Sequence, residues 1–296
     1  MKFTPRKIIY VLLIIILMSL AVWAFIIEPN RLIVNNYELK LKKWSANLNG
    51  FKIVAISDIH AGSNSITEEK IKEVVALANA QNPDLIVLLG DYVSRNYLQP
   101  TTLKMPLEKM QQNLNGLQAK YGVYSVIGNH DHEYDGKSIR LGFEKSGYKV
   151  LENEVNTIKV NGEKIRILGT HDILKAVSSW HQASRDIKTV LEKAENQTGN
   201  LIVLTHNPDS VVYMTEELSI SNDFSILLAG HTHGGQCIFP LIGAPYVPSE
   251  FGQKYAAGHI RDKGIDMFVT SGIGTSILPV RFGVAPEIAV LHIYSE

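Results

Sequence analysis

Cysteine is almost absent from this sequence, since Cys237 is the only one among 296 residues. A single thiol cannot form an intramolecular disulfide, and it cannot build a thiolate metal site. Neither sign of charge is in excess, because 29 Lys and Arg residues balance 29 Asp and Glu residues. No nucleic acid polymer is therefore expected as a partner, since nucleic-acid binding usually shows as a basic excess. The remaining composition, 45% hydrophobic and 20% charged, is typical of a globular protein with a large core.

The N-terminus differs from the rest of the chain. Basic residues in segment 1–7 precede the run Ile8–Ile27, in which only Tyr10 and Ser19 are polar. A helix of that length spans about 30 Å, the thickness of a bilayer core. A buried helix of a soluble protein rarely stays apolar on every face for so long. Residues 8–27 are therefore predicted to be a transmembrane anchor, which Pro29 ends.

A cleaved signal peptide is the alternative to an anchor, with Val22-Trp23-Ala24 as a poor cleavage site. The apolar run continues past that point and exceeds the usual ~7–15 residues of a signal-peptide core, which favours the anchor. The basic residues before the run favour a cytoplasmic segment 1–7 and an extracytoplasmic catalytic domain. Arg31 and the lysines that follow it weaken this bias.

Short apolar runs alternate with helical patterns after residue 50. Residues 28–50 are predicted to be a connector with strand character, and 51–296 to be the folded domain. The predicted strands are 52–57, 85–89, 122–127, 165–168, 201–205, 225–229, 267–270 and 288–293. The predicted helices are 67–81, 103–119, 137–145, 181–196 and 208–216. This alternation is typical of a layered α/β domain, with residues 236–266 as a surface loop.

Side chains that can bind metals follow five of the first six predicted strands. They occur in the motifs Asp58-Ile59-His60, Gly90-Asp91, Gly128-Asn129-His130-Asp131, Thr205-His206 and Gly230-His231-Thr232-His233. Sheets of α/β proteins build their sites at strand ends, so these side chains are expected to meet. Carboxylates, imidazoles and an amide together suit Mn²⁺, Fe²⁺ or Zn²⁺ better than Ca²⁺. One aspartate after a strand is usually a turn or cap residue, and only the complete set indicates a metal site.

In their order along the chain, the five motifs resemble those of the calcineurin-like metallophosphoesterase superfamily. The resemblance covers most of the chain after Phe51, and every ligand position of the family pattern is filled. It implies a layered α-β-β-α sandwich, two divalent metal ions (Mn²⁺, Fe²⁺ or Zn²⁺) and the hydrolysis of a phosphoester.

The resemblance also implies a role for each residue of the motifs. The implied ligands are Asp58, His60 and His233 for the first metal, Asn129, His206 and His231 for the second, and Asp91 as the bridge. His130 would lie beside the phosphate and stabilise charge or protonate the leaving oxygen. Asp131 would orient His130 through its other ring nitrogen. The nucleophile would be a water or hydroxide held by the metals.

Features after the last motif narrow the resemblance. The chain is similar in several further features to the membrane-associated bacterial branch of the superfamily. These features are the pair Gly234-Gly235, the later segments 279–282 and 286–288, and the apolar N-terminal run. That branch includes phosphodiesterases and UDP-diacylglucosamine hydrolases. The glycine pair would let the backbone approach a phosphate closely. Arg281 could contact that phosphate or form a buried ion pair with Glu287.

Two further residues, His171 and Asp172, follow the fourth predicted strand and could lie at the rim of the site. The sequence as a whole predicts a membrane-anchored phosphoesterase, a diesterase more than a monoesterase, acting on a small-molecule, lipid-linked or nucleotide-linked substrate. The alternative is a catalytically silent binding or scaffold module, although such relatives typically lack some of the ligands that are present here. A protein phosphatase would share the chemistry, but little in the chain suggests a docking groove for phosphoproteins.

Overall fold

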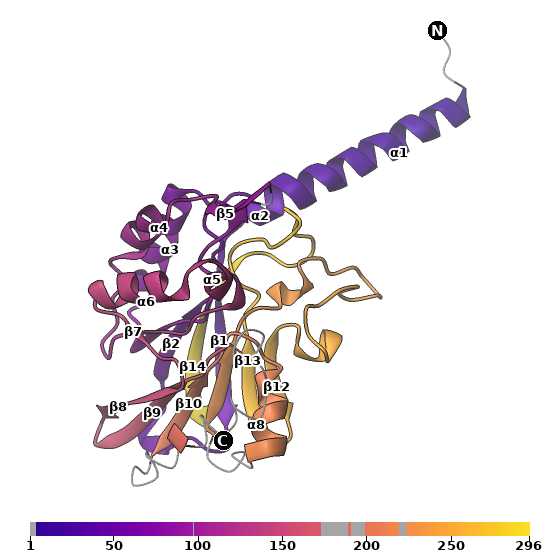
Figure 1. Cartoon of the computed structure of the whole chain (residues 1–296). Coiled ribbons are helices and arrows are strands. Elements are labelled where there is room, and N and C mark those ends of the chain that lie inside the picture. Colours follow the sequence, from indigo (N-terminus) through magenta and orange to yellow (C-terminus); the bar gives the residue numbers. More distant parts are fainter. Residues whose placement is uncertain (1–3, 97, 173–188, 191–198, 219–223) are drawn as a thin grey trace.

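Two six-stranded sheets form the centre of the domain (Figure 1). The computed structural model describes residues 4–96, 98–172, 189–190, 199–218 and 224–296. The first sheet contains, in spatial order, β1 (Ile33–Leu41), β14 (Glu287–Ser295), β2 (Phe51–Ile56), β3 (Leu85–Leu88), β6 (Val123–Ser125) and β7 (Lys149–Val150). The second contains β12 (Gly258–Asp262), β13 (Ile265–Val269), β11 (Ile226–Ala229), β10 (Asn200–Leu204), β9 (Glu163–Gly169) and β8 (Glu154–Val160). A separate hairpin joins β4 (Arg95–Asn96) to β5 (Gln99–Leu103).

Most neighbouring strands within each sheet run parallel. Strands β2, β3, β6 and β7 pair in parallel in the first sheet, as do β9, β10, β11 and β13 in the second. Antiparallel pairs occur where β14 meets β2, where β12 meets β13 and where β8 meets β9. The carboxyl ends of the parallel strands in each sheet therefore gather at one edge, where α/β proteins usually place their sites.

Helices cover the outer face of each sheet. On the first sheet, α3 (Glu68–Ala80), α4 (Leu107–Leu114) and α6 (Gly136–Lys145) bury their apolar sides against β2, β3 and β6. On the second sheet, α8 (Ser210–Leu218) packs against β10 and β11. The predicted α-β-β-α sandwich is thereby confirmed. Thr67 begins α3 as an N-cap, because its side chain accepts a hydrogen bond from the Lys70 amide.

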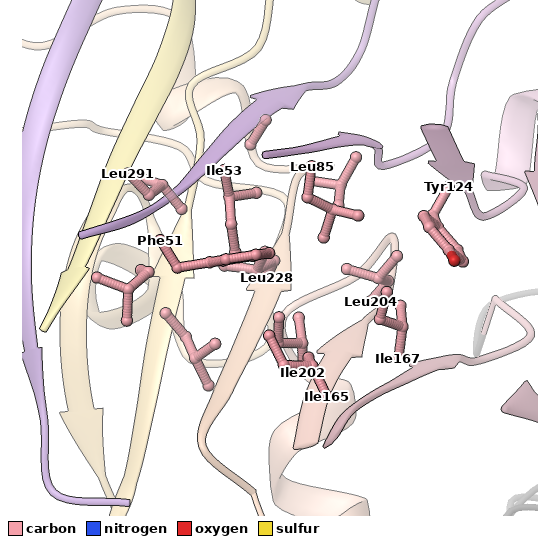
Figure 2. Close-up of a cluster of buried hydrophobic side chains, with 14 of the residues drawn as sticks. Phe51, Ile53, Leu85, Tyr124, Ile165, Ile167, Ile202, Leu204, Leu228 and Leu291 are labelled. Atoms are coloured by element: carbon pink, nitrogen blue, oxygen red, sulfur yellow. The ribbon is translucent and has the colours of Figure 1, made fainter. Parts of the chain in front are cut away.

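The main core lies between the two sheets (Figure 2). Phe51, Ile53 and Leu85 from the first sheet face Ile202 and Leu204 from the second (Figure 2), and all five are at most 3% exposed. Most of these strands are apolar on both faces because a helix layer covers the outer face and the second sheet covers the inner one. A core of this size holds the two strand edges that carry the site in a fixed relation to one another.

The N-terminal helix projects away from the sandwich (Figure 1). It runs through α1 (Pro5–Val22), a wider π-helical turn (Trp23–Ile27) and α2 (Glu28–Asn30), and it is long and apolar enough to cross a membrane. The segment predicted as a connector then supplies β1, which pairs in parallel with β14 along its whole length. The first sheet therefore begins at Ile33, upstream of residue 51.

Several predicted elements differ in extent from those observed. The predicted helix 103–119 is shorter, because Leu103 ends β5 and α4 begins only at Leu107, after Pro106. The short α5 (Asn129–Tyr134) and the strands β7, β8 and β12 were not predicted, because short or alternating segments carry weak periodicity. Most of the predicted helix 181–196, including His181, lies outside the described residues, as do residues 1–3.

Candidate metal centre

Two groups of potential metal ligands lie side by side where the two sheets meet. The groups are Asp58, His60 and His233, and Asp91, His206 and His231. Each loop that carries them follows a parallel strand, namely β2, β3, β10 or β11. The sheets are joined at this point, because the Asp58 Oδ2 atom from the first sheet accepts a hydrogen bond from the His231 amide of the second. The structure thus brings together the side chains that the sequence predicted would meet.

In the first group, the imidazoles of His60 and His233 lie almost parallel. Their Nε2 atoms are 3.2 Å apart, and the His233 Nε2 atom is 3.4 Å from Asp58 Oδ1. Burial lowers the pKa of His60 to about 3, and burial also holds the pKa of His233 well below its usual range. Both rings are therefore neutral, with a lone pair on at least one nitrogen available to a metal ion.

In the second group, His206 lies between three other ligands. Its Nε2 atom is 3.2 Å from each of Asp91 Oδ2, His231 Nδ1 and Asn129 Oδ1, while its Nδ1 contacts the Leu89 carbonyl oxygen at 2.7 Å. The carbonyl fixes the tautomer that leaves Nε2 as the ligand atom. Burial alone would lower the pKa of His206, but the Asp91 carboxylate outweighs it and raises that pKa well above the usual value.

Asp91 lies between the groups. Its Oδ2 atom is 3.2 Å from His206 Nε2 and 3.7 Å from His60 Nε2, and its Oδ1 accepts a hydrogen bond from the His130 amide. Burial would raise its pKa, but the neighbouring imidazoles, His206 above all, hold it well below the usual range. One ionised carboxylate therefore faces both ligand groups, which is the arrangement that a bridging ligand requires.

The backbone at these positions is strained. Asp58, His60, Asp91, His231 and His233 all have positive φ angles, between 45° and 70°. This conformation is uncommon for residues other than glycine, and strained backbone clusters at functional sites. Adjacent glycines make room: a Cβ on Gly128 would lie 2.3 Å from Asp91 Oδ1, and one on Gly230 would lie 2.6 Å from Asp58 Oδ2.

The donor set fits divalent metal ions. The Asp58 Oδ1 atom, which faces His233 Nε2, is buried without a hydrogen-bond partner, which is costly for a polar atom. Two pairs of imidazole nitrogens also face one another at 3.2 Å, in the His60–His233 and His206–His231 contacts. Shared cations would satisfy the facing lone pairs, and mixed nitrogen and oxygen donors suit Mn²⁺, Fe²⁺ or Zn²⁺.

His130 lies above the ligands in the wall of a cavity of about 270 Å³. Its ring makes an edge-on contact with His60, and its Nε2 atom is 3.5 Å from the Ser276 hydroxyl. Its Nδ1 atom points toward Glu133, 3.9 Å away. The ring therefore faces the cavity that residues of both ligand groups also line.

Asp131 has different partners from those that the sequence predicted. Its two carboxylate oxygens accept hydrogen bonds from the backbone amides of Asp91, Tyr92, Val93 and Gly128. The group that approaches His130 Nδ1 is Glu133 rather than Asp131. Asp131 is thus a positioning residue, which fixes the strained loop that carries Asp91.

Arg281 is fully buried and donates hydrogen bonds to backbone carbonyls. Its guanidinium reaches the carbonyls of Ser271, Gly272 and Gly274 at 2.7–3.1 Å. This loop in turn supports a candidate metal ligand, because the Gly274 amide donates to the Asp58 carbonyl at 2.6 Å. The Glu287 carboxylate accepts instead from Asn35, Tyr37, Thr270 and Ser271. The hydrogen bonds of Arg281 therefore hold this loop in place. They replace the two partners considered from the sequence, a substrate phosphate and the Glu287 carboxylate.

His171 belongs to a third group of potential ligands, with His132 and Glu152. The two imidazole rings stack at 4.5 Å, and each Nε2 atom lies 3.6–3.7 Å from Glu152 Oε1. Arg140 already binds the other Glu152 oxygen at 3.1 Å. The single carboxylate of this group is therefore already held in an ion pair, by a guanidinium that also binds Glu144 and Glu154.

The outer wall of the cavity was missed by sequence reasoning. It is formed by Tyr246, Pro248, Ile277 and Leu278, together with Gln236 and Ser276. Gly235 also lines the cavity, and a Cβ there would lie 2.6 Å from Ala244 Cβ, so the glycine lets the loop around Ala244 pack closely. The predicted loop 236–266 supplied the only signal, since apolar side chains in a loop rich in proline and glycine lack periodicity.

Comparison with known proteins agrees with this geometry. The family model described as calcineurin-like phosphoesterase matches residues 51–235. The uncharacterized metallophosphoesterase YkuE of Bacillus subtilis is 29% identical over 276 residues, covering 92% of this chain and 89% of that protein. Phosphodiesterase YaeI of Escherichia coli is 29% identical over 259 residues, covering 86% of each chain. A Danio rerio protein named as a transmembrane protein with metallophosphoesterase domain is 28% identical, covering 94% of this chain and 61% of that protein.

The family match spans every one of the five motifs, and the structure gathers their side chains at one edge of an α-β-β-α sandwich. The chain therefore belongs to the calcineurin-like phosphoesterase family.

Proposed function

We propose that this chain is a membrane-anchored phosphoesterase that uses two divalent metal ions to hydrolyse a phosphodiester. The observation that carries the proposal is the meeting of two ligand groups at one cavity, with Asp91 between them. Ions bound there would supply Lewis-acid charge to the phosphoryl oxygens and lower the pKa of a bound water. Every other step can be assigned to side chains of the protein.

His130 is suited to act as the general acid. Its ring lines the cavity, and its Nε2 atom is held by one weak contact, 3.5 Å from the Ser276 hydroxyl. That nitrogen can therefore turn to the leaving oxygen and donate a proton as the ester bond breaks. The His130 amide donates to Asp91 Oδ1, so the acid and the central carboxylate are held in a fixed relation.

Asn129 keeps the negative charge of the site low. Its Oδ1 atom lies 3.2 Å from His206 Nε2, next to the Asp91 carboxylate. An amide oxygen can bind a metal without adding a second negative charge at this point. An anionic substrate therefore meets less repulsion than it would if a carboxylate stood there.

The lining of the cavity favours a diester over a monoester. No lysine or arginine is among the described residues that line it. A phosphodiester carries one negative charge, which two metal ions can neutralise, whereas a monoester dianion usually gains from an additional guanidinium. The name of phosphodiesterase YaeI points in the same direction.

The outer wall favours a substrate with an apolar part. Tyr246, Pro248, Ile277 and Leu278 line the same cavity as residues of both ligand groups. An ester group bound at the metals would place its substituent against these side chains, as in a lipid-linked or nucleotide-linked substrate. The long apolar helix would hold the domain at the surface where amphiphilic substrates are found.

The anchor is proposed to place the catalytic domain outside the cytoplasm, because basic residues precede the helix. Fusion of alkaline phosphatase or of green fluorescent protein to the C-terminus tests this orientation in a bacterial host. An active phosphatase with a dark fluorescent fusion is expected. The reverse pattern would place the domain in the cytoplasm.

A substrate panel tests the proposed reaction. Full-length protein is purified in detergent, stripped of metal, and reloaded with Mn²⁺, Fe²⁺ or Zn²⁺. It is then assayed on an aryl monoester, an aryl diester, a cyclic nucleotide and UDP-diacylglucosamine. Metal-dependent hydrolysis of a diester, faster than that of the monoester, is expected. Protein that binds metal and hydrolyses none of the four would instead support the scaffold alternative.

A further inference from the structure

The mouth of the cavity carries an unusual concentration of exposed apolar side chains. In the described part of the chain, eight large hydrophobic side chains outside the N-terminal helix are exposed, and six of them come from two loops. We call these six the apolar rim: Phe239, Leu241, Ile242, Tyr246, Ile277 and Leu278. Leu241 is fully exposed and the other five are 40–68% exposed. Isolated exposed hydrophobics are common, but a gathered set marks an interaction surface.

The two loops form one surface. The Ile238 amide donates to the Phe282 carbonyl at 2.7 Å, and the Phe282 amide donates to the Gln236 carbonyl at 2.9 Å. The Gln236 side chain also accepts from the Ser276 amide at 2.6 Å. The rings of Phe239 and Phe282 pack at 5.3 Å. Backbone and side-chain contacts therefore join the two loops, so that the rim is one surface.

This surface is fixed to the base of the apolar helix. The Arg281 amide donates to the Ala24 carbonyl at 3.0 Å, and the Gly283 amide donates to the Glu28 carboxylate at 2.8 Å. Asn64 bridges the carbonyls of Phe25 and Pro279 at 2.9 and 3.0 Å. The helix leaves the domain on the side where these orange and yellow loops lie (Figure 1). A bilayer crossed by the helix would therefore meet the rim.

The rim is chemically suited to enter a bilayer surface. Neither the segment 236–248 nor the segment 271–280 contains a charged residue, so insertion would remove no charge from water. Leu241 and Ile277 have φ angles of 69° and 61°. A left-handed backbone is unfavourable for a bulky residue and most of all for a β-branched one. Strain that keeps apolar side chains exposed in water indicates a partner for them.

We propose that the apolar rim inserts into the bilayer that the helix spans, so that the cavity opens onto the membrane surface. Ile277, Leu278 and Tyr246 line the cavity as well as the rim. A phosphoester headgroup could then pass from the bilayer to the ligand groups while its apolar part stays against the rim. This inference rests on the proposed membrane anchoring and on the proposed phosphoesterase activity.

The depth of single fluorescent labels tests the insertion directly. In a Cys237→Ala background, the full chain carries an environment-sensitive label at Leu241→Cys and is reconstituted into vesicles of phosphatidylcholine and phosphatidylglycerol. Lipids with a spin label on the acyl chain quench only fluorophores that reach the hydrocarbon. Leu13→Cys, within α1, reports the anchor, and Leu141→Cys, on the distant helix α6, serves as the matched surface control.

Strong quenching is expected at Leu241→Cys and Leu13→Cys, with none at Leu141→Cys. Quenching at Leu13→Cys alone would overturn the insertion of the rim while leaving the anchor intact. Quenching at Leu241→Cys alone would support the rim and contradict the anchor. Absence of quenching at both positions would overturn the rim and the anchor together.

Turnover separates the rim from the chemistry. The double variant Leu241→Asp with Ile242→Asp changes rim residues that do not line the cavity. Hydrolysis of a phosphodiester lipid in vesicles is expected to fall about tenfold, because charges resist insertion. Hydrolysis of a soluble aryl diester should stay unchanged, as should both activities in Leu141→Asp. Equal loss on both substrates, or no loss on the lipid, would overturn the inference. Failure to hydrolyse any ester in the unmodified protein would instead contradict the proposed activity.

Discussion

The floor of the cavity, where the candidate metal ligands lie, and its mouth, where the apolar rim lies, both have a strained backbone. They differ in the side chains that this backbone holds, which are polar and buried on the floor and apolar and exposed at the mouth. On the floor, positive φ angles at Asp58, His60, Asp91, His231 and His233 turn polar side chains inward, where they are buried or nearly so. At the mouth, positive φ angles at Leu241 and Ile277 leave apolar side chains exposed. The floor thus desolvates groups that prefer water, and the mouth hydrates groups that avoid it. Each is stabilised only when its proposed partner, a metal ion or a bilayer, is present.

The largest expected effect comes from the floor, in Asp91→Asn. Among the described residues, the change removes the carboxylate that lies within 3.7 Å of an imidazole from each ligand group. A loss of several kcal/mol of transition-state stabilisation corresponds to a fall in kcat on the order of a thousandfold or more. Elemental analysis should show reduced metal content in the same protein.

Asp209→Asn is the matched control for this change. Asp209 is also buried, but it binds Ser249 and Glu250 away from the ligand groups. Near-normal activity is expected in the control. If Asp91→Asn kept both its metal and its turnover, the central role of this carboxylate would have to be given up.

His130→Ala should follow in size, with a different signature. Loss of a general acid typically lowers kcat by about 10²–10⁴-fold, while the metal ligands are untouched. Metal content should therefore stay at the level of the unmodified protein, and the defect should be smaller for aryl esters with a good leaving group. His132→Ala, which removes a ring that contacts His171 and Glu152 instead, should retain activity. An equal defect in both variants would point to a structural role for His130.

Gly128→Ala tests how closely the floor is packed. A Cβ at this position would lie 2.3 Å from Asp91 Oδ1, so the Asp91 loop has to move. We expect a fall in metal affinity and kcat/KM of about 10–100-fold, comparable to the loss of an outer-shell partner. In Gly162→Ala a Cβ meets nothing within 4 Å, and the φ angle of 84° costs about 1 kcal/mol of stability without a change in activity. Unchanged metal binding in Gly128→Ala would show that the floor can adjust.

Ile277→Asn tests the mouth and has the smallest expected effect. Asparagine tolerates a left-handed backbone better than isoleucine, so the melting temperature should rise by about 2–4 °C. KM for a lipid diester should rise a few-fold with kcat unchanged, because part of the apolar wall is lost. Leu241→Asn relieves similar strain outside the cavity and should leave KM for a soluble diester unchanged. A fall in melting temperature in both variants would argue against strain at the mouth.

Much of the floor could be predicted from the sequence because each motif follows an apolar strand. Asp58 and Asp91 lie in the loops that follow β2 and β3, and the chemistry of a ligand depends on its side chain and position alone. The partners of Asp131 could not be predicted in this way. Its four hydrogen-bond donors are backbone amides, and backbone groups look the same at every position of a sequence.

The connector and the mouth were harder to predict. Strand β1 was expected as strand-like, but its parallel pairing with β14, some 250 residues later, depends on a contact that no local pattern encodes. The role of Arg281 also depends on contacts that no local pattern encodes. Its charge suggested a phosphate or a carboxylate partner, and burial among the carbonyls of residues 271–274 gave it a positioning role.

By itself, the sequence determined which strand ends carry side chains able to bind metal, the layered α/β architecture and an N-terminal helix long and apolar enough to cross a bilayer. These features depend on side-chain chemistry, strand-end position and local periodicity, all of which can be read from the sequence. Only the tertiary structure decided that residues 236–248 and 271–283 meet at the base of that helix and close the cavity on its apolar side. Contacts between distant segments depend on packing and on shared backbone hydrogen bonds, which a linear pattern does not specify.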